Sequence, residues 1–166
     1  MTTTTNPNAL SLRRALGRFT TGICVAATRN ISGAPVGLTI NSFNSVSLNP
    51  PLVLWSIGRG TASHADFERS DRFAISVLAS TQKTISDRFA RPGDKFADVD
   101  WGEGRFGSPV IAGAIAVFEC RTAFRYEGGD HLILVGAVEG HRTAPGKPLL
   151  YVDGQYGVAL PHPEVA

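Results

Sequence analysis

The chain has 166 residues, enough for one domain with its own core, and its hydrophobic fraction of 43% is that of a globular protein. Charged residues make up only 18%, and the basic residues behind the net charge of +2 are dispersed, which argues against a nucleic-acid partner. The N-terminus MTTTTNPN lacks a signal-peptide pattern, and no apolar run reaches the roughly 18 residues of a membrane span. We therefore expect a cytoplasmic protein with no membrane contact, part of whose weakly charged surface is covered by another subunit.

The first third of the chain predicts a tail, a helix and a hairpin. Residues 1–8 are expected to be a disordered tail before a single domain over residues 9–162. Apolar residues from Leu10 to Phe19 fall near helical spacing, with Asn8 as a plausible N-cap. Strands are expected at residues 23–28 and 35–40, joined by a turn at 30–33.

The remaining elements follow from alternation and from turn residues. A polar segment at 41–47 precedes a buried strand at 52–57 and a helix at 61–70. A strand at 72–78 and a helix at 82–90, capped by Ser80 or Thr81, come next, and residues 91–109 are expected to form a loop. A long hairpin pairs residues 116–126 with 131–140, and a short one covers residues 149–160. Six or seven strands with three short helices, in an order that is not a repeating βαβ, favour an antiparallel barrel with helices at its rim.

Residues 37–64 are the first candidate binding segment. Hydroxyls, amides and glycines crowd between two apolar strands, which suits a flat polar ligand, although an ordinary Ser/Asn-rich connection has the same composition. Residues 58–63 follow a strand and open a helix, so they could bind a phosphate with Arg59 nearby, or Thr61 or Ser63 could simply cap the helix. The letters GEGRFG at 102–107 match a dinucleotide fingerprint, but no strand precedes them and no helix follows, so we interpret them as a loop.

Histidines and cysteines supply few further candidates. His131 directly follows the tight turn at 129–130, where it is either a surface residue or a ligand contact at the barrel mouth, and His64 is expected on a helix surface. Cys24 and Cys120 lie in apolar runs and are expected to be buried free thiols, with no metal-ligand spacing. No serine has the context of a catalytic nucleophile, and the carboxylates are scattered.

From about Leu12 to Leu160 the chain resembles the short-chain flavin reductases, the NAD(P)H:flavin oxidoreductases of two-component flavin monooxygenases. The segments that carry the resemblance are FTTG at 19–22, GLTINSF at 37–43, SVSLNPPLV at 45–53, FA at 89–90, GDH at 129–131 and GQY at 154–156. The resemblance implies a mainly β fold with short helices, the FMN-binding split β-barrel, as a homodimer with FAD or FMN near the subunit interface. It also implies NADH or NADPH as hydride donor, and a flavin-dependent monooxygenase as the partner that receives reduced flavin.

The resemblance also assigns site residues. His131 would face the nicotinamide as the catalytic residue. The flavin-binding residues would be Thr39, Asn41, Ser42, Phe43, Ser45 and Val46 at the ring and ribityl chain, Arg59, Thr61, Ser63 and His64 on the phosphate side, and Arg88, Phe89, Ala90 and Tyr156 completing the site. A flavin performs its own hydride chemistry, which agrees with the lack of an acid–base constellation in the sequence. Two alternatives are a flavin- or haem-binding split-barrel protein without turnover, and a pyridoxine phosphate oxidase-like enzyme, which would need a more basic phosphate pocket.

Overall fold

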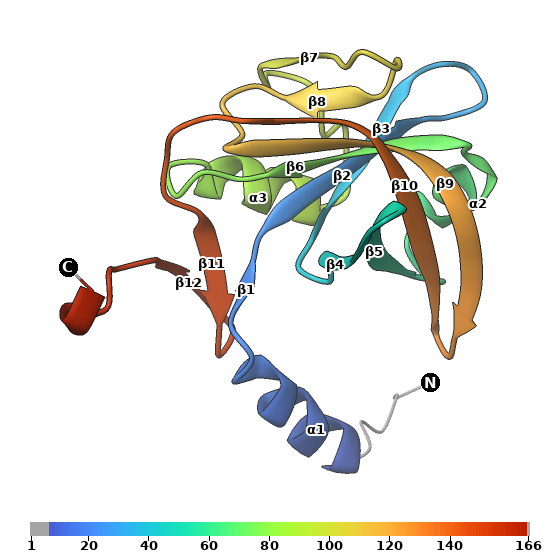
Figure 1. Ribbon diagram of the computed structural model, residues 1–166. Coiled ribbons are helices and arrows are strands. Elements are labelled where there is room, and N and C mark those ends of the chain that lie inside the picture. The colour runs from blue at the N-terminus through green and yellow to red at the C-terminus, as the bar shows by residue number, and fades with distance from the viewer. Residues whose placement is uncertain (1–6, 166) are drawn as a thin grey trace.

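The computed structural model describes residues 7–165 and is built around one curved, antiparallel seven-stranded sheet (Figure 1). Its strand order is β3-β2-β6-β9-β10-β5-β4, so β3 and β4 are the two edges. The mainly β fold with short helices expected from the sequence is confirmed. The strands of this sheet are β2 (Cys24–Arg29), β3 (Pro35–Ile40), β4 (Asn44–Leu48), β5 (Pro51–Gly58), β6 (Arg72–Val77), β9 (Ala116–Gly128) and β10 (His131–Thr143).

Smaller elements surround this sheet. A three-stranded sheet has the order β1-β11-β12, and β7 pairs with β8 on the opposite side of the molecule (Figure 1). The bounds of these strands are β1 Thr21–Gly22, β7 Trp101–Glu103, β8 Pro109–Ile111, β11 Leu149–Val152 and β12 Gln155–Val158. The helices are α1 (Pro7–Gly17), α2 (His64–Arg69), α3 (Lys83–Ala90) and a 3₁₀ turn, η1 (Pro163–Val165).

One core cluster lies inside the curve of the sheet, and a second one, which includes Val25 of β2 and Phe89 of α3, joins the sheet to that helix. Strand β5 shows why the first cluster lies there, because Val53, Trp55 and Ile57 alternate along it and all three are buried. The Trp55 ring meets Phe67 of α2 edge-on at 4.9 Å between centroids, so α2 closes this part of the core. A Cβ on Gly136 of β10 would lie 2.5 Å from the Phe73 ring, so only glycine lets the β9–β10 pair pack against that ring.

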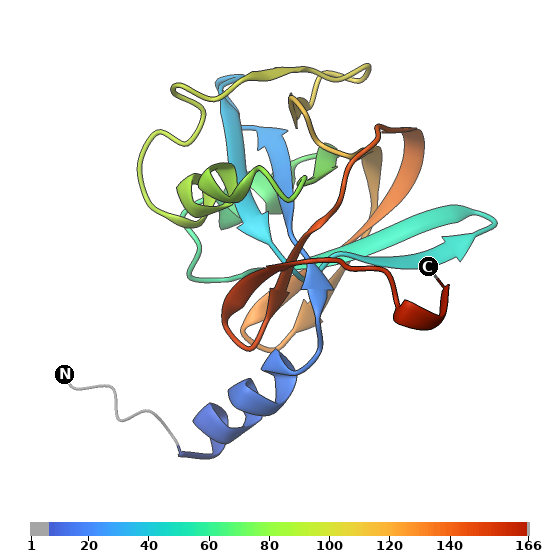
Figure 2. The ribbon, with the colours of Figure 1, turned by 90° about the vertical axis from the view of Figure 1, so that its left-hand side faces the viewer.

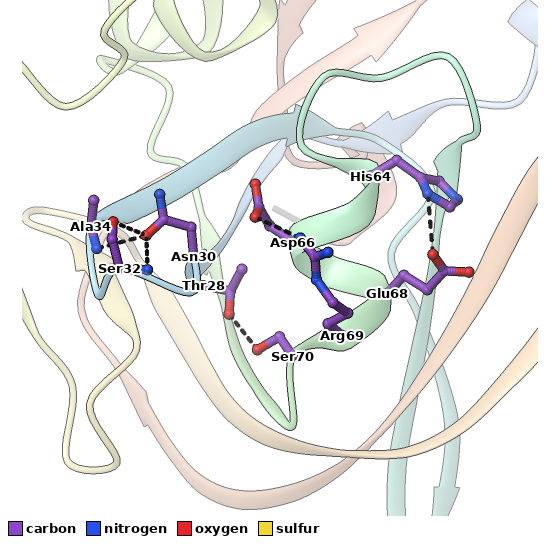
Figure 3. Close-up of polar contacts among 9 residues, drawn as sticks. All are labelled: Thr28, Asn30, Ser32, Ala34, His64, Asp66, Glu68, Arg69 and Ser70. Carbon is purple, nitrogen blue, oxygen red and sulfur yellow. Dashed lines mark hydrogen bonds and ion pairs between the residues drawn. The ribbon is translucent and has the colours of Figure 1, made fainter.

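Helix α2 is tied to the sheet by its C-terminal end. The Ser70 hydroxyl lies 2.6 Å from the Thr28 hydroxyl (Figure 3). The Thr28 hydroxyl also donates a hydrogen bond to the Arg72 carbonyl oxygen. Thr28 is 1% exposed, so this bond is largely shielded from water. The connection joins the C-terminal end of α2 and the start of β6 to β2.

Several local expectations were wrong. Residues 44–48 form strand β4 instead of a loop, because pairing with β5 satisfies their backbone groups. Helix α2 begins at His64 and not at 61, and α3 has Gln82 as its N-cap, without a side-chain capping bond. Asn8 lies inside α1 and is not its cap. Two short strands, β7 and β8, interrupt the loop expected over 91–109, while the prediction that no helix opens after GEGRFG is confirmed.

The expected disordered tail falls mostly on residues 1–6, which lie outside the described residues, whereas Pro7 and Asn8 begin α1. Cys24 and Cys120 are buried free thiols, as expected, and burial raises the pKa of each to about 12. No helix within residues 7–165 is long and apolar enough to cross a bilayer. Among the same residues, no three His, Cys, Asp or Glu side chains gather as a metal site would require.

Candidate functional site

A groove of about 1080 Å³, which we call the main groove, runs between the end of edge strand β3, helix α1 and the β11–β12 hairpin. Five of the expected flavin-binding residues line it: Thr39, Asn41, Ser42, Ala90 and Tyr156. They come from three separate parts of the chain. The fold therefore brings together, in one concave and partly apolar surface, short polar side chains of the kind that orient a planar ligand.

A second cavity of about 470 Å³, the side hollow, is lined by the start of β3, by residues 61–63 and by residues 90–96. It contains Thr61 and Ser63 of the expected phosphate-side residues. Ala90 lines both cavities, so they lie on either side of the C-terminal end of α3. A ligand with a flat ring and a phosphate arm could occupy both.

Helix α3 is seated against β3 by the missing side chain of Gly37. A Cβ at Gly37 would lie 2.8 Å from the Phe89 ring, and that ring meets Phe96 edge-on at 4.9 Å. Phe89 is fully buried and is absent from the linings of both cavities. Its side chain therefore holds α3 against β3 and does not line the site. On the groove side, the Thr39 hydroxyl donates to the Ser86 carbonyl oxygen at 2.7 Å, which ties β3 to α3 a second time.

Tyr156 reaches the groove from β12 and is held by α3. Its hydroxyl donates to Asp87 Oδ1 at 2.9 Å and lies 2.9 Å from the Ser86 hydroxyl. Hydrogen bonds from Lys83 and Tyr156 keep the pKa of Asp87 below its usual range, while desolvation raises the pKa of Tyr156. The ionised Asp87 accepts a hydrogen bond from the Tyr156 hydroxyl. The lone pairs of the Tyr156 oxygen therefore remain available to accept hydrogen bonds.

The polar segment after β3 is fixed to the sheet by Ser42. Its hydroxyl accepts a bond from the Ser56 amide at 3.0 Å and donates to the Ser56 carbonyl oxygen at 3.2 Å. Phe43 turns inward and packs on Phe118 at 5.3 Å between centroids. Ser45 and Val46 lie on strand β4, next to a register shift and outside the linings of both cavities.

His131 lies where β5 and β10 pair at the end of the sheet. Its Nδ1 lies 2.7 Å from Asp130 Oδ1, which keeps the pKa of Asp130 below its usual range. A Cβ on Gly58 would lie 3.6 Å from His131 Nε2 and 3.5 Å from the Thr61 hydroxyl. The His131 imidazole and the Thr61 hydroxyl therefore both lie close to the backbone of Gly58, which has no side chain. Arg59, next in the chain, forms an ion pair with Glu127.

Two residues of the expected phosphate side have buried atoms without partners. Ser63 is 8% exposed, and its hydroxyl has no hydrogen-bond partner among the described residues. The same holds for Nε2 of His64, whose side chain is 12% exposed, so the expectation of a helix-surface histidine was wrong. A buried hydroxyl without a partner is costly, and one that lines a hollow is well placed to bind an anionic oxygen. The side hollow thus fits a phosphate.

Sequence reasoning missed two cations of this hollow, Arg91 and Lys95, which line it together with Asp66 and Asp94. Partial burial lowers the pKa of Lys95. The expected residue Arg88 does not line either cavity, because its guanidinium donates to the Ala97 carbonyl oxygen and fixes the loop after α3. The turn-forming residues RPGD at 91–94 predicted a loop. They did not predict that this loop lies beside β3, where it lines the same hollow.

These features define a small-molecule-binding protein of the split-barrel type, with a groove of polar and apolar side chains at one sheet edge and a hollow suited to phosphate beside it. The chain belongs to the flavin reductase family, because the model of the flavin reductase like domain matches residues 16–159. It is similar to the FMN reductase (NADH) SmoA of Agrobacterium fabrum, with 46% identity over 150 residues that cover 90% of this chain and 86% of the relative. It is 41% identical to HsaB of Mycobacterium tuberculosis, the reductase subunit of a flavin-dependent monooxygenase, over 88% of this chain and 80% of that one.

A similar fold occurs in a solved structure whose ligands are known. The NADH:FAD oxidoreductase SgcE6 of Streptomyces globisporus, in complex with NAD and FAD fragments, superposes with a TM-score of 0.89 at 38% identity, over 95% of this chain and 97% of that chain. Some relatives are longer. The chain spans 47% of the reductase component of the trigonelline monooxygenase of Acinetobacter baylyi, with which it is 42% identical over 87% of its own length.

Proposed function

We propose that the protein is an NAD(P)H:flavin oxidoreductase that reduces FAD or FMN and supplies the reduced flavin to a partner flavin-dependent monooxygenase. The main groove carries this proposal, because it collects Thr39, Asn41 and Tyr156 around a surface that suits a planar ring. A bound flavin would supply the hydride-accepting chemistry. The residues of the chain then need only bind and orient the two reactants and exclude water.

The division of labour follows the two cavities. Residues 39–42 present short side chains and backbone groups to the ring, so the main chain can approach it closely. The hydroxyl groups of Thr61 and Ser63, which line the side hollow, donate hydrogen bonds to the phosphate. We assign the orientation of the nicotinamide to His131, which Asp130 holds and which lies outside the linings of both cavities. The assignment of Ser45 and Val46 on β4, and of Arg59 directly after β5, as ligand contacts remains a prediction.

The decisive test is steady-state oxidation of NADH and NADPH by the purified protein, with FAD, FMN and riboflavin as acceptors. Oxidation of either nucleotide that depends on added or bound flavin is the expected result. The alternative of a flavin- or haem-binding protein without turnover predicts a bound chromophore in the absorbance spectrum but no nucleotide oxidation. That outcome would exclude the reductase.

Replacing Ser63 by alanine should weaken FMN binding about tenfold, because a buried hydrogen bond to a charged oxygen is lost. Riboflavin lacks the phosphate, so its affinity should not change. The free energy of unfolding should stay the same or rise, since the hydroxyl has no partner among the described residues. Fluorescence titration and urea unfolding measure these quantities, with Ser80→Ala, outside both cavities, as the control. Equal loss of FMN and riboflavin affinity would contradict a phosphate site.

We further propose a homodimer. Figure 2 shows the hairpin β4–β5 extending away from the rest of the sheet, and on it Val46 is 48% and Leu48 is 93% exposed. Such apolar side chains on a projecting hairpin favour burial by a partner. Light scattering should give the mass of a dimer, and Leu48→Asp should shift it toward the monomer. The control Ile31→Asp, at a site 94% exposed on another hairpin, should leave the mass unchanged. A monomeric wild-type protein would contradict the proposal.

The monooxygenase partner rests on the relatives that are reductase components of such enzymes. Its substrate is open, and the cytoplasmic location expected from the sequence stays a prediction.

A further inference from the structure

Two arginines of α1 bring uncompensated positive charge to the main groove. Arg13 and Arg14 line the groove and are exposed. Neither guanidinium has an ion pair or a hydrogen bond with any other residue in 7–165. The site residues assigned so far make no use of this charge.

The acidic side of the groove does not balance these charges. Asp153 is the one carboxylate among the described residues that line the groove, and it is already paired with Arg18 at 2.5 Å. The remaining polar residues of the lining, such as Thr39 and Asn41, are neutral. The groove therefore presents two guanidinium groups that have no partner within residues 7–165, and guanidinium groups bind phosphate oxygens well.

Helix α1 is held in place beside the groove. The Asp153 amide donates to the Gly17 carbonyl oxygen at 2.8 Å, and Arg18 pairs with the same aspartate. In Figure 1 the C-terminal end of α1 accordingly lies next to the turn of the β11–β12 hairpin. Tyr151 and Tyr156 of this hairpin line the same groove as the arginines and add aromatic surface to it.

We propose that Arg13 and Arg14 bind the phosphate groups of the nicotinamide dinucleotide. This inference rests on the proposed reductase function. A flavin phosphate is the other source of the same chemistry, but we have proposed that it binds in the side hollow, where the hydroxyl of Ser63 has no partner among the described residues. The arginines lie at the main groove and do not line the side hollow. With about 1080 Å³, the main groove exceeds the range of about 300–1,000 Å³ usual for one small ligand, so a second reactant has room beside the ring.

The test compares two hydride donors with riboflavin as acceptor, so that no flavin phosphate is present. NADH carries a pyrophosphate, whereas 1-benzyl-1,4-dihydronicotinamide carries none. In the double variant Arg13→Gln/Arg14→Gln, kcat/KM for NADH should fall about tenfold through KM, as expected for two solvent-exposed charged contacts. For the benzyl donor it should not change. Added salt should raise the KM for NADH of the wild type more than that of the variant.

The control Arg105→Gln/Lys147→Gln removes two exposed positive charges outside the groove and should leave KM for NADH unchanged. An unchanged KM for NADH in the α1 variant would overturn the proposal, and so would an equal loss with both donors. A loss confined to FMN or FAD as acceptor, with riboflavin unaffected, would also overturn it by assigning the arginines to the flavin. If the wild type oxidises neither donor, the proposed function itself fails, an outcome distinct from these three.

Discussion

Replacement of His131 by alanine should lower kcat for NADH oxidation by about 10- to 100-fold while flavin affinity stays within twofold of the wild type. The reason is positional. Asp130 holds Nδ1 of His131 at 2.7 Å, so Nε2 is directed toward the bare backbone of Gly58. A nicotinamide that loses this contact samples unproductive orientations above the ring. Stopped-flow reduction measures the rate, and fluorescence titration measures the flavin affinity.

Two variants sharpen this test. Asp130→Asn keeps the size of the side chain but weakens the hold on the imidazole, so it should give a smaller loss of rate. His141→Ala, an exposed histidine farther along β10, should have no effect. Reduction at the wild-type rate in His131→Ala would remove the catalytic role assigned to this residue, whereas a matching loss of flavin affinity would make it a flavin contact.

The pH dependence follows from the sign of the Asp130 shift. Its hydrogen bond with His131 lowers the pKa of Asp130 below the ordinary value of 3.8. A depressed carboxylate pKa means that the contribution of the ionised Asp130 is fully present above 3.8 and is lost only as the pH falls through the lower folded-state value. Asp130 should therefore contribute no step to the rate profile near neutral pH.

The largest loss of stability is expected from Phe89→Ala, at about 3–5 kcal/mol. Phe89 is fully buried, fills the space left by Gly37 on β3, and packs on Phe96. Its removal leaves a cavity under the strand that carries Thr39, so flavin binding should weaken as well, although the ring never lines the groove. Urea unfolding gives the free energy, and flavin titration gives the affinity.

Ile31→Ala is the control, because Ile31 is 94% exposed and should change stability by no more than about 0.5 kcal/mol. Phe89→Leu should retain part of the stability and most of the flavin affinity, since it refills part of the cavity. A Phe89→Ala protein as stable as the wild type would show that α3 does not depend on this contact. If Phe89→Ala loses the expected stability but binds flavin as tightly as the wild type, the packing of α3 on β3 does not contribute to flavin binding.

Much of the fold was predictable because its signals are local. Strand β3 occupies residues 35–40 as expected, and the turn before His131 leads into the long β9–β10 hairpin. Strand β4 was missed because Asn44, Ser45 and Ser47 are small and polar and most of the strand is exposed, so that only its pairing with β5 makes it a strand. The start of α2 was misplaced because Thr61 and Ser63 resemble caps, whereas backbone turns around Gly58 and Thr61 delay the helix to His64.

The candidate site divides in the same way. The order of residues by itself determined the polar stretch at 39–42, the tight turn before His131 and the family resemblance, because each of these depends on neighbours in the chain. The tertiary structure brought Tyr156 and Ala90, which the resemblance had already assigned to the site, beside that stretch. It alone left the Ser63 hydroxyl buried without a partner among the described residues and brought Arg13 and Arg14 to the groove. Burial and distance between remote segments are set by how the sheet curves and how α1 and α3 pack on it, and these are properties of the folded chain as a whole.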